Sequence, residues 1–251
     1  MLGHGAGSYE AWWAQHGTLA VFVRDAHSLY FETLAELGAI GLALLVAAAA
    51  AVLLASWRRI RRLSAARADG VAAATAVVVA YAVSAGIDWV WELPVVTLVA
   101  FTCLAVALAP ARAAHKVAGA PARAAVVGVA MVVVVAQAIP FLSQARISES
   151  QSAASRGDLA GALASARAAR RVQSWAPDPW LQLALVHEQR GDLEAAQTAI
   201  RRAIGEDRED WRLWLVLARV DTKLGEIVEA RRSLHRAISL NPRSPLFAQL
   251  R

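Results

Sequence analysis

The chain has 251 residues, of which 57% are hydrophobic, and its mean hydropathy is +0.42. An ordinary soluble domain of this size is less apolar, so the composition excludes one and predicts membrane-spanning helices. The net charge is +6, but the basic residues cluster beside apolar stretches or spread over amphipathic segments. This distribution argues against a nucleic-acid partner.

The first 35 residues form a polar segment that leads into a long apolar stretch. Arg24, His27 and the carboxylates Asp25, Glu32 and Glu36 lie at this entrance. Residues this polar are rarely placed at a membrane surface without a function. We expect a helix to begin near residues 25–28, because Asp and Ser are good N-cap residues. The positive end of its dipole then lies close to any anion at the membrane boundary.

Four segments are apolar enough to cross a membrane. A hydrocarbon core about 30 Å thick needs about 20 apolar residues in a helix. Because backbone groups in lipid must be satisfied within their own segment, the sequence predicts an all-α membrane bundle over residues 36–143. Its spans are 37–57, 71–87, 93–109 and 124–142, of which the second and third are short.

The basic residues predict how these spans are oriented. They lie in the first and third connections between spans, which are therefore expected to face the cytoplasm. Residues 1–35, the turn at 88–92 and everything after residue 142 are then extracytoplasmic. The basic residues concerned are Arg58, Arg59, Arg61, Arg62 and Arg67 in the first connection, and Arg112, Lys116 and Arg123 in the third.

Residues 146–251 are polar and repeat with a period of 34. The tripeptide Gly157-Asp158-Leu159 recurs as Gly191-Asp192-Leu193 and as Gly225-Glu226-Ile227, and alanines follow in step at 162, 196 and 230 and at 169, 203 and 237. This pattern resembles the tetratricopeptide repeat, a helix–turn–helix unit. It implies an α-solenoid of about three repeats that binds a protein partner. A structural cap on the membrane part is the alternative.

A second resemblance concerns the start of the chain. His27-Ser28 is followed by nine residues, Gly38, two more residues and Gly41. This is similar to the His-[Asn/Ser/Gln]-x9-Gly-x2-Gly element of the O-antigen ligase and polymerase family of bacterial membrane glycosyltransferases. The glycine-rich run at residues 3–9 resembles the opening of that family's large extracytoplasmic loop. The resemblance covers roughly residues 1–60.

The resemblance implies a multi-pass protein of the bacterial cytoplasmic (inner) membrane. Its reaction would transfer a glycan from undecaprenyl diphosphate, a lipid-linked donor, to the hydroxyl of a glycan, lipid or protein acceptor outside the membrane. His27 matches the catalytic histidine of the motif and would act as general base, since imidazoles titrate near ambient pH. These residues do not distinguish a ligase from a polymerase or from an enzyme that glycosylates proteins.

Other residues of the segment have supporting roles in this hypothesis. Arg24 suits the donor diphosphate through charge-assisted contacts, although it aligns with no family arginine; a lipid headgroup or an ion pair with Asp25 is the alternative. Ser28 caps the helix. Glu32 and Glu36 orient His27 or an acceptor, or have structural roles. Gly38 and Gly41 would let a neighbouring helix approach closely.

The sequence predicts neither a metal nor a cofactor. The histidines are scattered, Cys103 is the only cysteine, and no phosphate-binding loop is present. Members of the resembled family carry further spans before this loop. We therefore expect the chain to be the carboxy-terminal part of a longer enzyme, with little activity alone. The alternative function is a non-enzymatic, membrane-anchored repeat scaffold for envelope polysaccharide assembly.

Overall fold

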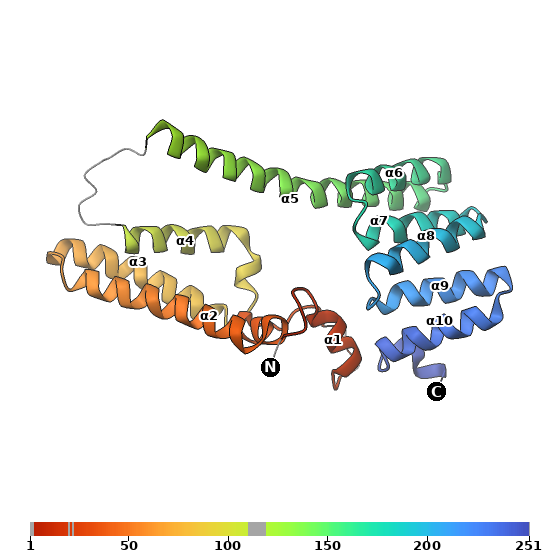
Figure 1. Ribbon diagram of the computed structural model, residues 1–251, viewed down its shortest axis with the longest axis horizontal. Helices are drawn as coiled ribbons and strands as arrows, with labels where there is room; N and C mark the ends of the chain where they lie inside the picture. Colours follow the sequence, from red (N-terminus) through yellow and green to blue (C-terminus); the bar gives the residue numbers. More distant parts are fainter. Residues whose placement is uncertain (1–2, 20, 22, 110–118, 251) are drawn as a thin grey trace. The chain divides into compact units, whose positions relative to one another are not determined.

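A computed structural model describes residues 3–19, 21, 23–109 and 119–250 of the chain. Throughout these residues the regular structure is helical, which confirms the predicted all-α fold (Figure 1). The helices form two units. The first contains α1 to α4 and the second contains α5 to α10.

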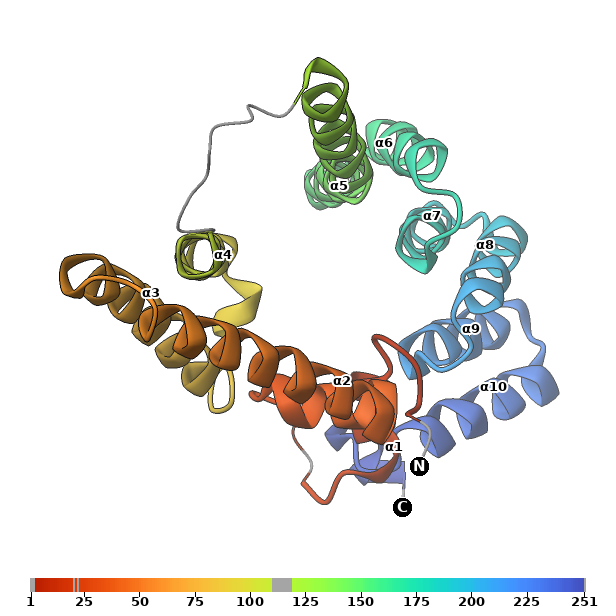
Figure 2. The same cartoon turned by 60° about the vertical axis from the view of Figure 1, so that its left-hand side comes forward.

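The first unit is built from three antiparallel helices preceded by a short one. Its elements are α1 (Tyr9–His16), α2 (Leu29–Ile60), α3 (Ala65–Ser84), the 3₁₀ turn η1 (Val90–Glu92) and α4 (Pro94–Leu108). The connections are short, and α3 packs against both α2 and α4 (Figure 2). The start of α2, the end of α3 and the start of α4 therefore share one end of the unit. The end of α2 and the end of α4 share the other.

Within the described residues, three helices are long and apolar enough to cross a membrane, namely α2, α3 and residues 123–155 of α5. Their apolar side chains are exposed rather than packed: Val132 and Phe141 of α5 are 69% and 74% exposed. A helix that is apolar on all faces needs an apolar environment around it. The chain is therefore suited to association with a membrane. The apolar helix α4 is shorter, at 15 residues or about 22 Å.

The second unit joins an apolar helix to the repeat region without a break. Helix α5 (Ala120–Ser155) begins with the apolar segment and continues into a polar part that packs against α6. The predicted domain boundary near residue 146 thus falls inside one helix. The remaining elements are α6 (Leu159–Val172), α7 (Pro177–Gln189), α8 (Leu193–Glu206), α9 (Trp211–Leu224), α10 (Ile227–Leu240) and the 3₁₀ segment η2 (Pro245–Leu250).

Helices α5 to α10 form three hairpins, α5/α6, α7/α8 and α9/α10, as the period of 34 predicts. Each hairpin turns at a glycine with a left-handed backbone; at Gly225 φ is +82°. Glycine adopts this conformation without the steric cost of a Cβ. The periodic alanines are at most 6% exposed, so their small side chains lie where the helices approach one another.

The indole groups of equivalent tryptophans confirm that the repeats are alike. Trp180 donates a hydrogen bond from Nε1 to the Ser174 carbonyl, and Trp214 does the same to the Arg208 carbonyl, both at 2.9 Å. Each bond joins the first turns of a helix to the loop before it. These rings therefore fix the entry of the α7/α8 and α9/α10 hairpins.

A buried carboxylate links the second and third hairpins. Glu188 of α7 accepts hydrogen bonds from Arg219 Nε and Nη2 of α9 at 2.8 and 2.7 Å, and Lys223 Nζ lies 2.8 Å from Glu188 Oε1. Burial alone would raise the pKa of Glu188. The bonds and charges of Arg219 and Lys223 outweigh burial and lower this pKa below its usual range. The carboxylate is therefore ionised at neutral pH.

We predict that Glu188→Gln destabilises the repeat region by about 1–2 kcal/mol at pH 7, because it removes the charge that the two cations face. The folded-state pKa is lower than the unfolded one, so this stability is present above the unfolded pKa and is lost as the pH falls through the folded one. Urea unfolding of the full chain in detergent should show a difference at pH 7 that shrinks at pH 3.5.

Glu229→Gln is the matched control, since Glu229 forms an exposed i,i+3 pair with Arg232 at 3.8 Å. Exposed pairs contribute little, so this variant should change the stability by less than about 0.5 kcal/mol. Equal losses in the two variants at pH 7 would show that the Glu188 contacts add nothing specific.

Candidate functional site

The start of α2 is held by its cap and by the end of α3. Ser28 is almost fully buried, and its Oγ accepts a hydrogen bond from the Phe31 backbone N–H at 3.5 Å. Leu29 N donates to the Ala85 carbonyl at 2.8 Å, and the Tyr30 hydroxyl donates to the Ala82 carbonyl at 2.7 Å. The predicted helix start is therefore confirmed, and tertiary contacts fix its position within the first unit.

His27 and Arg24 lie on the loop just before this helix, and both side chains are exposed. His27 has a positive φ of 51°, which is uncommon for a residue other than glycine. Its ring meets Trp89 of the α3–α4 turn edge to face, with centroids 5.4 Å apart. The imidazole thus stands at the end of the helical unit, held by a strained backbone and one aromatic contact, and open to solvent.

Glu32 and Glu36 bind backbone groups of the preceding segments. Glu32 Oε2 accepts from the Ala26 N–H at 3.3 Å, and Glu36 Oε1 accepts from the N–H of Tyr9, the first residue of α1, at 3.4 Å. These contacts favour the structural role that the sequence left open. Burial raises the pKa of the Tyr9 hydroxyl, and the negative charge of Glu32 raises it further.

Helix α2 is broken at Gly38, whose φ and ψ of 71° and −170° are not helical. Such a break leaves carbonyl groups without helical partners. The carbonyls of Ala35 and Glu36 accept hydrogen bonds from the N–H groups of His4 and Gly5, at 3.0 and 2.9 Å. The glycine-rich run at the start of the chain is therefore bound to the kink.

The two glycines of the motif thus act differently from the prediction. Gly38 and Gly41 do not form one continuous helical face for a neighbouring helix, because the backbone turns at Gly38. Gly3 lies so close that an added Cβ would collide with the Glu36 carbonyl, and a Cβ on Gly41 would collide with the Leu37 side chain. Small residues are needed here to let the chain fold onto the kink.

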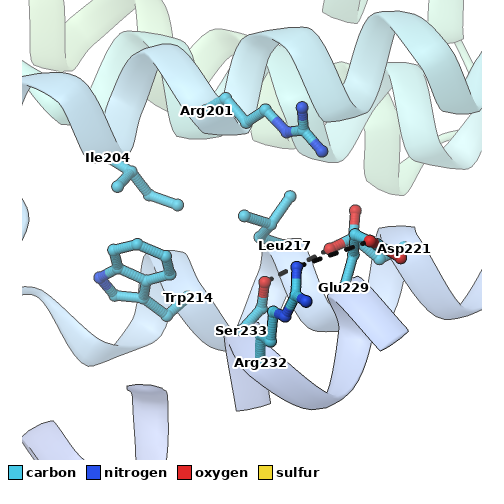
Figure 3. Close-up of a pocket in the computed structure, with 8 residues that line it drawn as sticks. All are labelled: Arg201, Ile204, Trp214, Leu217, Asp221, Glu229, Arg232 and Ser233. Atoms are coloured by element: carbon cyan, nitrogen blue, oxygen red, sulfur yellow. Dashed lines mark hydrogen bonds and ion pairs between the residues drawn. The ribbon is translucent and has the colours of Figure 1, made fainter. Parts of the chain in front are cut away.

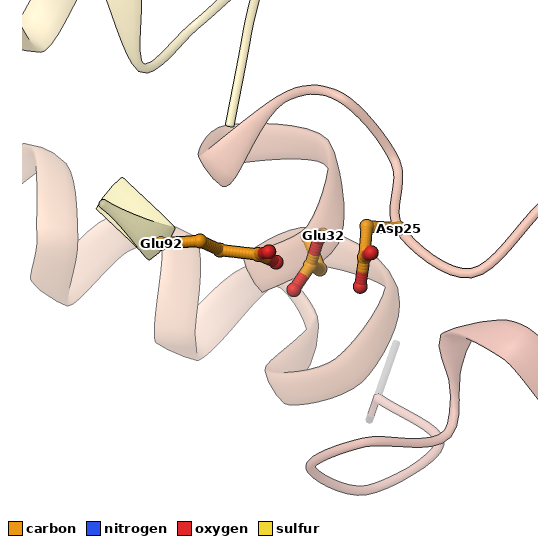
Figure 4. A group of neighbouring side chains, drawn as sticks. All are labelled: Asp25, Glu32 and Glu92. Carbon is orange, nitrogen blue, oxygen red and sulfur yellow. The ribbon is translucent and has the colours of Figure 1, made fainter. Parts of the chain in front are cut away.

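Three carboxylates converge beside this kinked helix (Figure 4). Asp25 from the loop, Glu32 from α2 and Glu92 from η1 each offer an oxygen, and these atoms lie within 4.8 Å of one another. Like charges this close repel, and a cation would offset the repulsion. Carboxylate oxygens suit Mg²⁺, Ca²⁺ or Mn²⁺ rather than a softer metal.

The sequence does not reveal this group, because its members are three separate carboxylates and not a cluster of histidine and cysteine residues. The sequence gives one indication that these carboxylates are neighbours, which is the predicted order of the spans in the membrane. The turn at 88–92 was expected on the same side of the membrane as residues 1–35, which permits Glu92 to approach Glu32. The spacing of residues along the chain does not specify the distance between these side chains.

Two of the grooves in the described part of the repeat region are lined by residues from several helices. One, of about 240 Å³, lies between α5 and α7, the first helices of neighbouring hairpins. Three amide side chains, Gln151, Gln182 and Gln189, line it together with Leu185 and Val186. Amide groups both donate and accept hydrogen bonds, as a peptide backbone does.

The other groove, of about 270 Å³, lies among α8, α9 and α10 (Figure 3). Trp214 and Leu217 contribute its apolar surface. Its polar side chains bind one another: Ser233 Oγ donates to Asp221 Oδ2 at 3.3 Å, and Arg232 pairs with Glu229. Of the two grooves, the one between α5 and α7 presents more amide groups suited to an extended peptide.

Comparison with known proteins identifies one part of the chain. A family model described as Tetratricopeptide repeat matches residues 187–251. The match covers the end of α7 and the elements that follow it, and the hairpins α5/α6 and α7/α8 extend the same architecture towards the start of the chain. No curated protein matches this chain. The matched region does not include residues 1–60, on which the glycosyltransferase resemblance depends.

Proposed function

We propose that the protein is a membrane-anchored scaffold whose repeats bind an extended segment of a protein partner. Tetratricopeptide-like repeats and apolar, membrane-capable helices together support this function. The observation that carries the proposal is the groove between α5 and α7. It combines the exposed amide groups of Gln151 and Gln189, which match a peptide backbone, with the partly exposed apolar side chains of Ala154 and Leu185.

The continuity of α5 supports the scaffold as well. The same helix contains the membrane-capable stretch of residues 123–155 and contributes Gln151 to the groove. A bound partner is therefore held by a helix that is itself anchored. An interaction domain built in this way recruits its partner to the membrane surface.

Photo-crosslinking tests this proposal in cells that express the full chain. A photoreactive amino acid at Leu185, in the groove, is expected to give a discrete adduct with one protein. Substituting Gln151→Ala and Gln189→Ala should abolish that adduct, because the amide contacts to the peptide are lost. The control places the same probe at Thr198, which is exposed on α8. The scaffold proposal fails if both positions give the same adducts, or if the glutamine substitutions change nothing.

We further propose that the end of the unit around His27 performs glycosyl transfer of the O-antigen ligase type. The supporting observation is the exposed imidazole of His27, held on a strained backbone at the start of α2. Strain of this kind is frequent at functional positions. The proposed substrate is a glycan on undecaprenyl diphosphate, and the acceptor is a glycan, lipid or protein hydroxyl.

In this reaction the acceptor oxygen attacks the anomeric carbon of the donor sugar. His27 takes the hydroxyl proton as the new carbon–oxygen bond forms. The bond between the anomeric carbon and the diphosphate oxygen breaks, and undecaprenyl diphosphate leaves with the electron pair. Arg24, exposed on the same loop, is the proposed contact for the diphosphate. Ser28 and the kink at Gly38 hold the helix from which this loop extends.

The proposed location is the bacterial cytoplasmic membrane, with residues 1–35 and the repeats outside and the basic α2–α3 connection inside. The excess of arginines in that connection supports the orientation. Four spans are proposed, which include the short helix α4. Donors linked to undecaprenyl diphosphate are used on the outer side, where this orientation places His27.

We predict that His27→Ala, introduced into the native gene, lowers glycan transfer from the lipid carrier by about 10²–10⁴-fold, the usual contribution of a general base. His16→Ala is the control, because His16 is an exposed histidine of α1 that stacks on Trp12. Transfer is measured in isolated membranes with a labelled lipid-linked glycan, at matched protein levels. Undiminished transfer by the His27 variant would remove the base assignment and leave the scaffold proposal standing.

A further inference from the structure

A basic cleft lies at the end of the first unit opposite to His27. Its volume is about 390 Å³, and it is bounded by the end of α2, the α2–α3 connection and the end of α4. Among the described residues its lining contains three arginines and no carboxylate. The arginines are Arg58, Arg59 and Arg62, and the apolar lining consists of Ala55, Leu63, Ala107, Leu108 and Ala109.

Arg59 is fixed in this cleft by helix α4. Its Nη1 donates to the carbonyls of Val106 and Ala107 at 3.0 and 2.9 Å, and so satisfies two groups that the end of α4 leaves without helical partners. Its Nε is buried and has no hydrogen-bond partner within the described part of the chain. A buried donor on a cation is costly unless an acceptor reaches it. The cleft therefore holds one fixed positive charge beside the two exposed guanidinium groups of Arg58 and Arg62.

The position of the cleft indicates which anion reaches it. It lies where the apolar helices α2 and α4 end, and the adjacent Trp57 is exposed, as is typical of indoles at the membrane–water interface. The phosphates of lipids are concentrated at that depth. Guanidinium groups bind phosphate oxygens through paired, charge-assisted hydrogen bonds. The apolar lining suits the glycerol backbone and the first carbons of an acyl chain.

We propose that this cleft binds the phosphate group of an anionic glycerophospholipid, with the exposed guanidinium groups of Arg58 and Arg62 as direct donors and Arg59 as a third, fixed positive charge. A zwitterionic headgroup is a poorer ligand, because its own ammonium group would lie among three guanidinium groups. The site is separate from the His27 loop and from the repeat grooves, and it depends on neither proposed function.

The test compares lipid binding by the purified full chain in detergent, measured by native mass spectrometry. Phosphatidylglycerol, phosphatidylcholine and inorganic phosphate are titrated separately. The cleft variant is Arg58→Gln with Arg62→Gln, which leaves Arg59 and its bonds to α4 in place. The matched control, Arg61→Gln with Arg67→Gln, removes the same charge from the same connection at positions that do not line the cleft. Circular dichroism establishes that each variant is helical.

We expect phosphatidylglycerol to bind the unmodified chain more tightly than phosphatidylcholine does. Each arginine near an anionic headgroup is worth about fivefold in affinity, so the cleft variant should bind about 20–30-fold more weakly. The control should lose less than about fivefold. Equal losses of lipid affinity in the two variants would show that the lipid responds to the overall positive charge and not to the cleft. Inorganic phosphate that displaces the lipid at similar concentrations would make the site one for a free anion. Either result overturns the proposal.

Discussion

The fold depends on one constraint, which is that most apolar side chains of α2, α3 and the first part of α5 remain exposed among the described residues. Such surfaces are stable only in an apolar environment, and a bilayer is an environment of this kind. The polar groups of the first unit then gather at the two ends of its helices. His27, Asp25, Glu32 and Glu92 are at one end, and the arginine cleft is at the other.

The two ends are built by similar means. At the His27 end, backbone N–H groups of the first residues bind carbonyls exposed by the kink at Gly38. At the opposite end, the Arg59 guanidinium binds carbonyls exposed by the end of α4. In both places a helix terminus or break creates unsatisfied groups, and satisfying them positions side chains at an end of the apolar helices. The two proposed ligands, a polyprenyl diphosphate and a phospholipid, would meet different ends of the same helices.

The parts of this structure that could be predicted are those specified by local or periodic signals. The glycines at 157, 191 and 225 predict the turns of the hairpins because their backbone has a positive φ, and the periodic alanines predict the close helix contacts because they are buried there. Ser28 likewise predicts the start of α2. The kink at Gly38 could not be predicted, because a Gly-x2-Gly pattern equally favours helix packing. Glu92 joins Asp25 and Glu32 from the α3–α4 turn, and the Arg59 contacts span 47 positions, so both depend on how α2, α3 and α4 pack.

The most direct test of the account is the membrane orientation of the chain. Single cysteines at Gln15, Arg61 and Thr198, in a Cys103→Ala background, would be treated in intact cells with a membrane-impermeant maleimide. The account predicts labelling at positions 15 and 198, and at position 61 only after the membrane is permeabilised. Labelling of position 61 alone in intact cells would place His27 and the repeats inside the cell and contradict the account.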